Sequence, residues 1–285
     1  MYTEREYGAL IFMGRENSKM PPVMILCGGR GTRLREVTEL LPKPMVPIGD
    51  FPVVWHIMKS YAAFGVRRFI LCLGYKREEF VNFFLNYRAR TSDITLTLGN
   101  EPQMTFHRGD DEADWQVTLA ATGLDTMTGG RVLKASRYLS PEDENFFLTY
   151  GDGVADIDLD ELYAHHLSGG KMLTISAVHP EGRFGELEFD GDTVLAFNEK
   201  PLRRAGFING GFMVARREVV ERYLAGKPDR FFEAEPMGQI AADGEMRLFR
   251  HEGFWQCMDN PREYKMLNEL WESGSAPWTR FWKKS

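Results

Sequence analysis

The chain has 285 residues, of which 43% are hydrophobic and 27% charged, so its composition is that of a folded globular protein and not of a disordered one. Its 35 Lys and Arg residues against 41 Asp and Glu residues give a net charge of −6, which argues against a duplex nucleic-acid binder. No apolar run approaches the roughly 20 residues that span a membrane, and we expect neither a membrane segment nor a secretory signal.

The three cysteines are odd in number and far apart, which favours a reduced, cytoplasmic chain over a disulfide framework. Residues 1–22 end in Pro21-Pro22 and are interpreted as an N-terminal extension, either an oligomer arm or a poorly ordered tail. Residues 23–285 contain no linker or repeat and are predicted to form a single domain.

Strand-like and helix-like runs alternate along this domain. The short apolar run Val23–Cys27 predicts a buried strand, and Pro52–Gly65 carries apolar residues at helical spacing. The later predicted strands are Phe69–Leu73, Ile94–Leu98, Phe146–Thr149, Leu173–Val178 and Phe212–Ala215, and the later helices are Arg77–Ala89, Gly130–Tyr138, Asp160–Leu167 and Pro261–Trp271. The order predicts an α/β fold: a mostly parallel sheet flanked by helices, with a hairpin inserted around Asp190-Gly191-Asp192.

A glycine-rich loop follows the first strand directly. Gly28, Gly29 and Gly31 let the backbone approach a ligand and turn N–H groups toward it. Arg33 and Lys43 add two cations, so the segment suits a polyphosphate. The loop matches neither the Walker pattern nor the dinucleotide pattern. A plain strand-to-helix turn is the alternative interpretation of the glycines by themselves.

Two aspartates follow strand-like runs. Asp152 lies between Gly151 and Gly153 after the strand at Phe146–Thr149, and Asp259 follows a second run that ends at Met258. Carboxylates at the carboxyl end of a sheet suit Mg²⁺, which takes one or two of them together with phosphate oxygens. Taken singly, each is more often a turn residue or a helix cap.

Three polar residues come at the ends of later strands. Glu199 and Asn209 can hydrogen-bond sugar hydroxyls, and Lys200 can pair with a phosphate. Surface charge and turns are the commoner roles of such residues. Near the end of the chain, Trp271, Trp278 and Trp282 are predicted to hold the C-terminal segment against the body.

The run Leu26–Leu34 with Leu41-Pro42-Lys43-Pro44-Met45 resembles the signature of the sugar-1-phosphate nucleotidyltransferases. Narrower motifs follow in order, including 127–131, 149–156, 182–185, 197–201, 208–212 and 254–259. Together they resemble the branch of the family whose substrates are CTP and glucose 1-phosphate. The loop departs from the family pattern at Cys27 and Arg30, where Ala and an apolar residue are usual.

The resemblance implies a Rossmann-like fold, an oligomer and a Mg²⁺ cofactor held by Asp152 and Asp259. It also implies catalytic roles for Arg33, Lys43 and Asp152. The residues implied to bind the nucleotide are Leu26, Gly28, Gly29, Arg30, Gly31, Thr32, Arg33, Lys43, Thr126, Arg131 and Gly151. Those implied on the sugar-phosphate side are Glu199, Lys200, Asn209 and Gly210.

The implied reaction is an in-line attack of the sugar phosphate on the α-phosphorus of CTP, which needs charge neutralisation and no general base. The alternatives are a transferase that uses UTP, dTTP or another sugar, and a non-catalytic sensor of nucleotide sugars. The guanidinium of Arg131 presents only donors, so it is our candidate for reading the O2 and N3 acceptors of cytosine. A structural ion pair at the start of a helix is the alternative for this residue.

Overall fold

The first predicted strand, Val23–Cys27, forms β1 near the middle of a seven-stranded sheet. The computed structural model describes residues 20–31, 41–99, 103–107, 112–180, 186–190, 193–198, 206–227 and 229–282, with the backbone alone for 186–190 and 193–198. The expectations for the extension up to residue 19, and for Thr32, Arg33, Glu199 and Lys200, lie outside the described residues.

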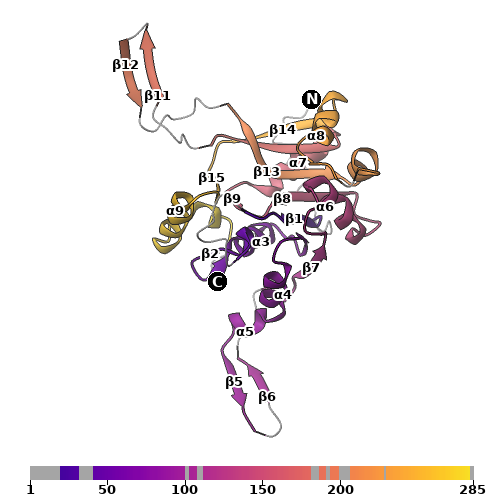
Figure 1. Cartoon of the computed structure of the whole chain (residues 1–285), viewed down its shortest axis with the longest axis vertical. Coiled ribbons are helices and arrows are strands. Elements are labelled where there is room, and N and C mark those ends of the chain that lie inside the picture. Colours follow the sequence, from indigo (N-terminus) through magenta and orange to yellow (C-terminus); the bar gives the residue numbers. More distant parts are fainter. Residues whose placement is uncertain are drawn as a thin grey trace, which may run out of the picture.

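The sheet is mixed and mostly parallel, as the sequence predicts (Figure 1). Its strands lie in the order β14 (Met246–His251), β10 (Leu173–Val178), β13 (Ile208–Arg216), β8 (Asn145–Tyr150), β1, β4 (Arg68–Leu73) and β7 (Gln116–Ala121). β13 runs antiparallel to its neighbours β10 and β8, whereas the other neighbouring pairs are parallel. The carboxyl ends of β1 and β8 therefore meet at one edge.

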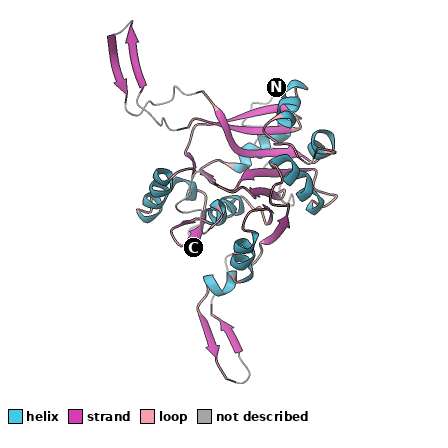
Figure 2. Ribbon diagram, in the orientation of Figure 1, coloured by secondary structure: helices cyan, strands magenta, loops and turns pink. Residues whose placement is uncertain are grey.

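Helices cover both faces of this sheet (Figure 2). Residues of α3 (Val53–Ala63), α4 (Arg77–Leu85), α7 (Leu159–Gly169) and α9 (Pro261–Glu272) join the core on one face. Residues of α6 (Thr128–Ala135), the short π-helix η4 (Val220–Leu224) and α8 (Glu235–Ala242) join the core on the other.

Strand β1 belongs to both cores because successive side chains of a strand point to opposite faces. Val23, Ile25 and Cys27 enter the first core, and Met24 and Leu26 enter the second. Burying each large apolar side chain contributes about 1.5–3 kcal/mol. The continuous apolar run that predicted a buried strand thus reflects a strand covered on both faces.

Some boundaries differ from the prediction. The helix expected over 77–89 is divided: α4 ends at Leu85, and α5 spans Tyr87–Thr91. Between them Asn86 leaves the helical conformation, with φ −101° and ψ 15°, and its amide donates to the carbonyl of Asn82. An Asn side chain competes for backbone groups in this way and so favours helix ends.

Two hairpins project from the body at opposite ends of the view in Figure 1. One, predicted around residues 190–192, is formed by β11 (Glu186–Asp190) and β12 (Thr193–Asn198). The other is formed by β5 (Ile94–Thr97) and β6 (Gln103–Phe106), of which only the first strand was predicted.

The C-terminal segment packs around His56 of α3, as expected from its tryptophans. The rings of Trp271, Trp278 and Trp282 lie 4.7, 6.1 and 5.7 Å from the His56 ring. Nε2 of His56 donates to the carbonyl of Ile48, and Nδ1 accepts from the indole N–H of Trp278. These contacts hold the neutral imidazole in one tautomer and join the end of the chain to the segment after Lys43.

Candidate active site

A cavity of about 530 Å³ opens at the carboxyl ends of β1 and β8. Its lining comes from the glycine loop, from Lys43, from residues 124–128, from the end of β8 and from Asp259. In open α/β sheets ligands bind at this edge. The expected site residues Gly28, Gly29, Arg30 and Gly31 are therefore brought to a pocket.

Arg131 fixes the start of the glycine loop. Its Nη2 donates to the carbonyl of Gly28 at 3.0 Å, and a Cβ at position 28 would overlap the guanidinium. Gly31 has a φ of +62°, a conformation that favours glycine. Further along the loop, Arg30 forms an exposed ion pair with Asp125 at 3.0 Å. Packing against Arg131 thus requires the glycine at 28.

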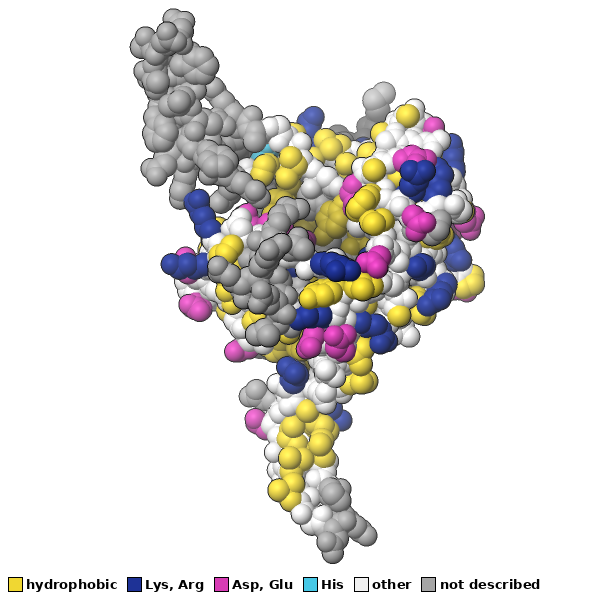
Figure 3. All heavy atoms as spheres, in the orientation of Figure 1, with side chains coloured by type: hydrophobic (Ala, Val, Ile, Leu, Met, Phe, Trp, Pro, Cys, Tyr) yellow, Lys and Arg dark blue, Asp and Glu magenta, His cyan; other side chains and the backbone are white. Residues whose placement is uncertain are grey.

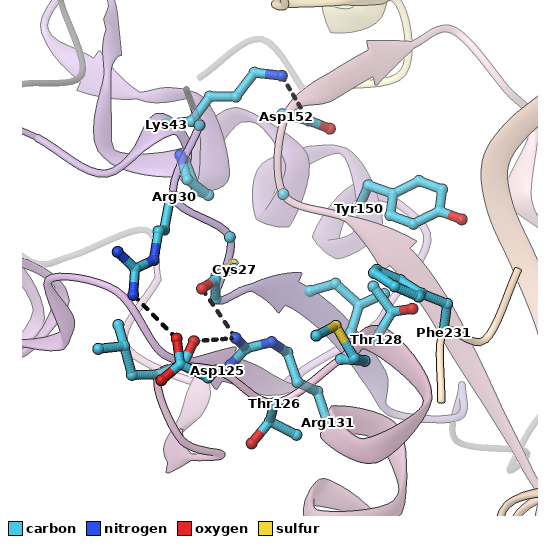
Figure 4. Close-up of a pocket in the computed structure, with 18 of the residues that line it drawn as sticks. Cys27, Arg30, Lys43, Asp125, Thr126, Thr128, Arg131, Tyr150, Asp152 and Phe231 are labelled. Carbon is cyan, nitrogen blue, oxygen red and sulfur yellow. Dashed lines mark hydrogen bonds and ion pairs between the residues drawn. The ribbon is translucent and has the colours of Figure 1, made fainter. Parts of the chain in front are cut away.

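Lys43 lies between the two predicted metal ligands. Its Nζ donates to Asp152 Oδ2 at 2.6 Å and to Asp259 Oδ1, and the Lys43 residue is 8% exposed (Figure 4). Burial by itself lowers the pKa of Lys43, but attraction and hydrogen bonds to Asp152 and Asp259 outweigh it and raise the pKa. The lysine is therefore an ammonium ion held in contact with both carboxylates.

A short antiparallel ladder brings these two aspartates together. It pairs β9 (Gly153–Ala155) with β15 (Trp255–Cys257), with Cys257 opposite Gly153. The N–H of Met258 extends the pairing by donating to the carbonyl of Asp152 at 2.8 Å. Asp152 and Asp259 thus follow the same end of the ladder, which brings their carboxylates close together.

The donor set fits Mg²⁺. Both carboxylates converge on one cation, the Lys43 ammonium. Mg²⁺ is commonly held by one or two carboxylates plus substrate phosphates. Among the described residues, no group of three or more His, Cys, Asp or Glu side chains gathers to form a complete protein site. A metal here would therefore take its remaining oxygen ligands from water or from a substrate.

The expectation that Arg131 presents a free fork to cytosine is wrong for this structure. Its Nη1 donates to Thr122 Oγ1 at 2.8 Å and to the carbonyls of Gly123 and Leu73 at 2.7 and 3.3 Å. Its Nη2 donates to the carbonyls of Gly28 and Leu124. These acceptors use the N–H groups of both terminal nitrogens, so Arg131 ties the loop at 122–124 to the glycine loop.

Other expected residues lie around the same cavity. Gly151 donates its N–H to the carbonyl of Leu26 at 3.1 Å, and a side chain at 151 would meet the sulfur of Cys27. Thr126 Oγ1 donates to Thr122 and accepts from Lys134. Burial raises the pKa of Cys27 well above its ordinary value, which disfavours the reactive thiolate form of this pocket residue.

Asn209 and Gly210, which were predicted for the sugar-phosphate side, follow Ile208, the first residue of β13. The side-chain oxygen of Asn209 accepts from the N–H of Gly211 at 2.9 Å, and its amide donates to the hydroxyl of Tyr150 at 3.4 Å. The carbonyl of Gly210 accepts from the indole N–H of Trp255. Asn209 therefore contacts the pocket lining, whereas Gly210 connects β13 to the ladder.

Sequence reasoning missed several pocket residues, chiefly Asp125, Thr128, Tyr150 and Phe231. Thr128, Tyr150 and Phe231 form one side of the cavity, away from the Arg30–Asp125 pair (Figure 4). No motif marks Phe231, which lies in an irregular segment before α8. Its neighbour in sequence, Phe232, is fully buried. In the sequence, two adjacent phenylalanines are typical of core residues, so nothing distinguishes Phe231 as a pocket residue.

The sequence model of the nucleotidyl transferase family matches residues 22–255. Glucose-1-phosphate cytidylyltransferase of Salmonella typhi is 44% identical over 255 residues, which cover 90% of this chain and 97% of that relative. The probable glucose-1-phosphate cytidylyltransferase of Bacillus subtilis is 41% identical over 256 residues, 90% and 98% of the two chains. Among solved structures, HddC of Yersinia pseudotuberculosis has a TM-score of 0.63 at 25% identity, over 88% of this chain and all of that one.

Proposed function

Since the chain belongs to the nucleotidyl transferase family, we propose that it catalyses the reaction of CTP with α-D-glucose 1-phosphate to give CDP-glucose and pyrophosphate. The observation that carries this proposal is the contact of Lys43 with Asp152 and Asp259 at the carboxyl edge of the sheet. This contact places a cation and two carboxylates in a pocket that is also lined by a glycine loop.

The chemistry is dominated by charge. A sugar-phosphate oxygen attacks the α-phosphorus of CTP in line with the leaving pyrophosphate, and two anions must approach each other. Lys43, already an ammonium ion, would neutralise charge near the α-phosphate. The N–H groups of the glycine loop would hold the triphosphate, and Arg33 would stabilise the leaving pyrophosphate. The attacking oxygen is already anionic, so the chain needs no general base.

Asp152 and Asp259 would hold Mg²⁺ together with substrate phosphates. When bound, the ion supplies Lewis-acid neutralisation of phosphate charge. The β9–β15 ladder keeps both carboxylates on one side of the pocket, where they could bind the ion together. Lys43 would exchange part of its contact with the carboxylates for contact with phosphate.

The test is pyrophosphate release, measured with CTP, UTP, dTTP, ATP and GTP against a panel of sugar 1-phosphates. We expect the highest kcat/KM for CTP with glucose 1-phosphate. A clear preference for UTP, dTTP or another sugar would replace the substrate assignment and keep the reaction type. Binding of CDP-glucose without release of pyrophosphate in any combination would instead support a sensor.

We also propose that the chain associates with further copies of itself in the cytoplasm. Leu96 and Met104 are direct partners across the β5–β6 hairpin and are 54% and 56% exposed (Figure 3). Large apolar side chains that share one exposed face favour a protein partner. Unpaired thiols at all three cysteines are consistent with a reducing compartment.

Light scattering after gel filtration tests the association. Wild type should elute as an oligomer, and Leu96→Lys with Met104→Lys should elute as smaller particles. Leu167→Lys, at a 45% exposed leucine of α7, is the matched control and should keep the wild-type size. An unchanged size for the hairpin variant would show that the hairpin is not the contact.

A further inference from the structure

The segment before α8 is fastened to the start of α6. The carbonyl of Arg230 accepts from the N–H of Gly129 at 3.0 Å, and the N–H of Phe232 donates to Thr128 Oγ1 at 2.8 Å. A Cβ at position 129 would lie 2.7 Å from the Arg230 carbonyl, so the close approach requires glycine there. Phe231 is therefore held from both sides at a fixed place on the pocket wall.

Phe231 is nevertheless poorly buried. It lines the cavity and remains 54% exposed, whereas the adjacent Phe232 is completely buried. An apolar ring that is fixed in place and faces a pocket gains its burial when a ligand covers it. The position thus indicates a contact with substrate.

Glu233 connects this wall to Tyr150. Its carboxylate accepts from the Tyr150 hydroxyl at 2.7 Å and from Thr128 Oγ1 at 2.5 Å. Burial raises the pKa of Tyr150, and the Glu233 carboxylate raises it further, so the phenol keeps its proton and donates. Two hydrogen bonds leave further acceptor capacity on a carboxylate, which offers about four lone-pair sites.

The wall contacts Asn209, a residue that we expect on the sugar-phosphate side of the pocket. Tyr150 accepts from the amide of Asn209, and its ring fills the space where a Cβ of Gly211 would lie. Thr126 and Arg131, which we expect on the nucleotide side, are drawn below Tyr150 and Phe231 in Figure 4. Arg30 and Lys43, two of the cations that line the pocket, lie away from Phe231 in this view.

We propose that Phe231, Tyr150 and Glu233 form the wall that recognises the hexose of the sugar 1-phosphate. The ring of Phe231 covers an apolar C–H face of the hexose, and the oxygens of Tyr150 and Glu233 hydrogen-bond its hydroxyl groups. The aromatic ring complements the apolar C–H groups of a sugar, and the fixed carboxylate beside it complements the hydroxyl groups. This inference rests on the proposed function and adds to it three residues that select the sugar.

The experiment separates the two substrates. For Phe231→Ala we expect the KM for glucose 1-phosphate to rise about tenfold, the loss typical of one apolar contact in a pocket. The KM for CTP and the dissociation constant of CTP should stay within about twofold of wild type. The preference for glucose 1-phosphate over galactose 1-phosphate and mannose 1-phosphate should narrow.

Further variants control for folding and for simple loss of bulk. Phe231→Tyr and Phe231→Trp keep an aromatic face and should restore the KM for glucose 1-phosphate. Tyr138→Ala removes a 38% exposed aromatic ring that does not line the pocket and should change neither KM. Glu233→Gln keeps the shape of the side chain and should change the preference among hexose epimers more than it changes the KM for CTP.

The outcomes are distinct. If wild type releases pyrophosphate from CTP and glucose 1-phosphate but Phe231→Ala keeps both KM values, the assignment of Phe231 to hexose recognition is wrong and the proposed function stands. A raised KM for CTP alone would place the wall against the nucleoside and overturn the inference. If wild type releases no pyrophosphate, the proposed function fails. Calorimetry of glucose 1-phosphate binding to wild type and to Phe231→Ala then still tests whether Phe231 contacts the hexose, because only that contact predicts weaker binding by the variant.

Discussion

The ammonium of Lys43 lies 2.6 Å from the carboxylate of Asp152, although 109 residues separate the two in the sequence. With Asp259 they form a partly buried cluster of one cation and two anions. Removing Lys43 leaves two partly buried carboxylates without a compensating charge, which costs more stability than the loss of an exposed ion pair, whereas removing either aspartate leaves one ion pair. Each member therefore offers a test of catalysis and of charge balance.

Asp152→Asn and Asp259→Asn should each lower the turnover number at least about a hundredfold, because each removes one carboxylate charge from the proposed Mg²⁺ site. The Mg²⁺ concentration for half-maximal pyrophosphate release should rise in both variants. Asp125→Asn changes an exposed carboxylate that is not one of the two proposed Mg²⁺ ligands, so this control should keep the Mg²⁺ dependence of wild type. Near-full activity of both substituted enzymes would remove the metal assignment.

Lys43→Ala should impair catalysis and also leave two carboxylates facing each other. We expect kcat with CTP to fall at least about a hundredfold. Replacing a lysine with only a surface role would instead leave kcat unchanged and would alter the free energy of unfolding by about 0.5 kcal/mol or less. Lys43→Arg keeps the charge but not the shape, so its activity should lie between those of wild type and Lys43→Ala. Unchanged steady-state kinetics in Lys43→Ala would show that this lysine has no catalytic role.

Arg131→Ala should damage the pocket as a whole. It removes the donors of five hydrogen bonds, and leaving buried carbonyls unpaired costs on the order of 3 kcal/mol. Urea unfolding should show that loss, and kcat/KM should fall by a similar factor for CTP and UTP. A fall for CTP only, with the ratio to UTP narrowed, would instead restore Arg131 as the reader of the base.

Acid should destabilise the fold through two buried histidines. Burial lowers the pKa of His56 and of His166 from 6.5 to about 4, so between these pH values the unfolded chain binds more protons than the folded one. The free energy of unfolding therefore rises with pH in this window. As the pH falls from 6.5 to 4, the protein loses about 3 kcal/mol of stability for each of the two histidines.

Urea titrations at pH 7.5, 6.0 and 5.0 measure this slope. His56→Gln removes one titrating group, so its stability should depend less steeply on pH even though its stability at pH 7.5 is lower. For His56, a proton on Nδ1 would also face the indole N–H of Trp278. Equal unfolding free energies of wild type at pH 7.5 and 5.0 would contradict the assignment of neutral buried histidines.

The interior of the sheet could be predicted from sequence because both of its faces are buried. β1 and β10 are continuous apolar or small-residue runs, and their predicted bounds agree with the structure. The edge strands β7 and β14 escaped prediction because they are partly exposed. Arg247 and Arg250 interrupt the apolar pattern of β14, and tertiary pairing with β10 decides its conformation.

The site was predictable where backbone geometry limits the residue type. Glycines after a strand and aspartates at the ends of strands leave a signal in sequence, and the structure brings Gly28, Lys43, Asp152 and Asp259 to one pocket. Which guanidinium donors are free depends on carbonyls from distant loops, so Arg131 was misjudged. Phe231 left no signal, because its exposure follows from the anchoring of residues 230 and 232.

The contact between Lys43 and Asp259 spans 216 residues of the chain. At about 5–20 residues per second, the ribosome adds Asp259 on the order of 10 to 40 seconds after Lys43. The parallel pairing of β1, β4 and β8 needs no residue beyond Tyr150, so this part of the sheet can form on the nascent chain. The pocket then acquires its second carboxylate only after this part of the sheet has been synthesised, so activity has to wait for the addition of Asp259.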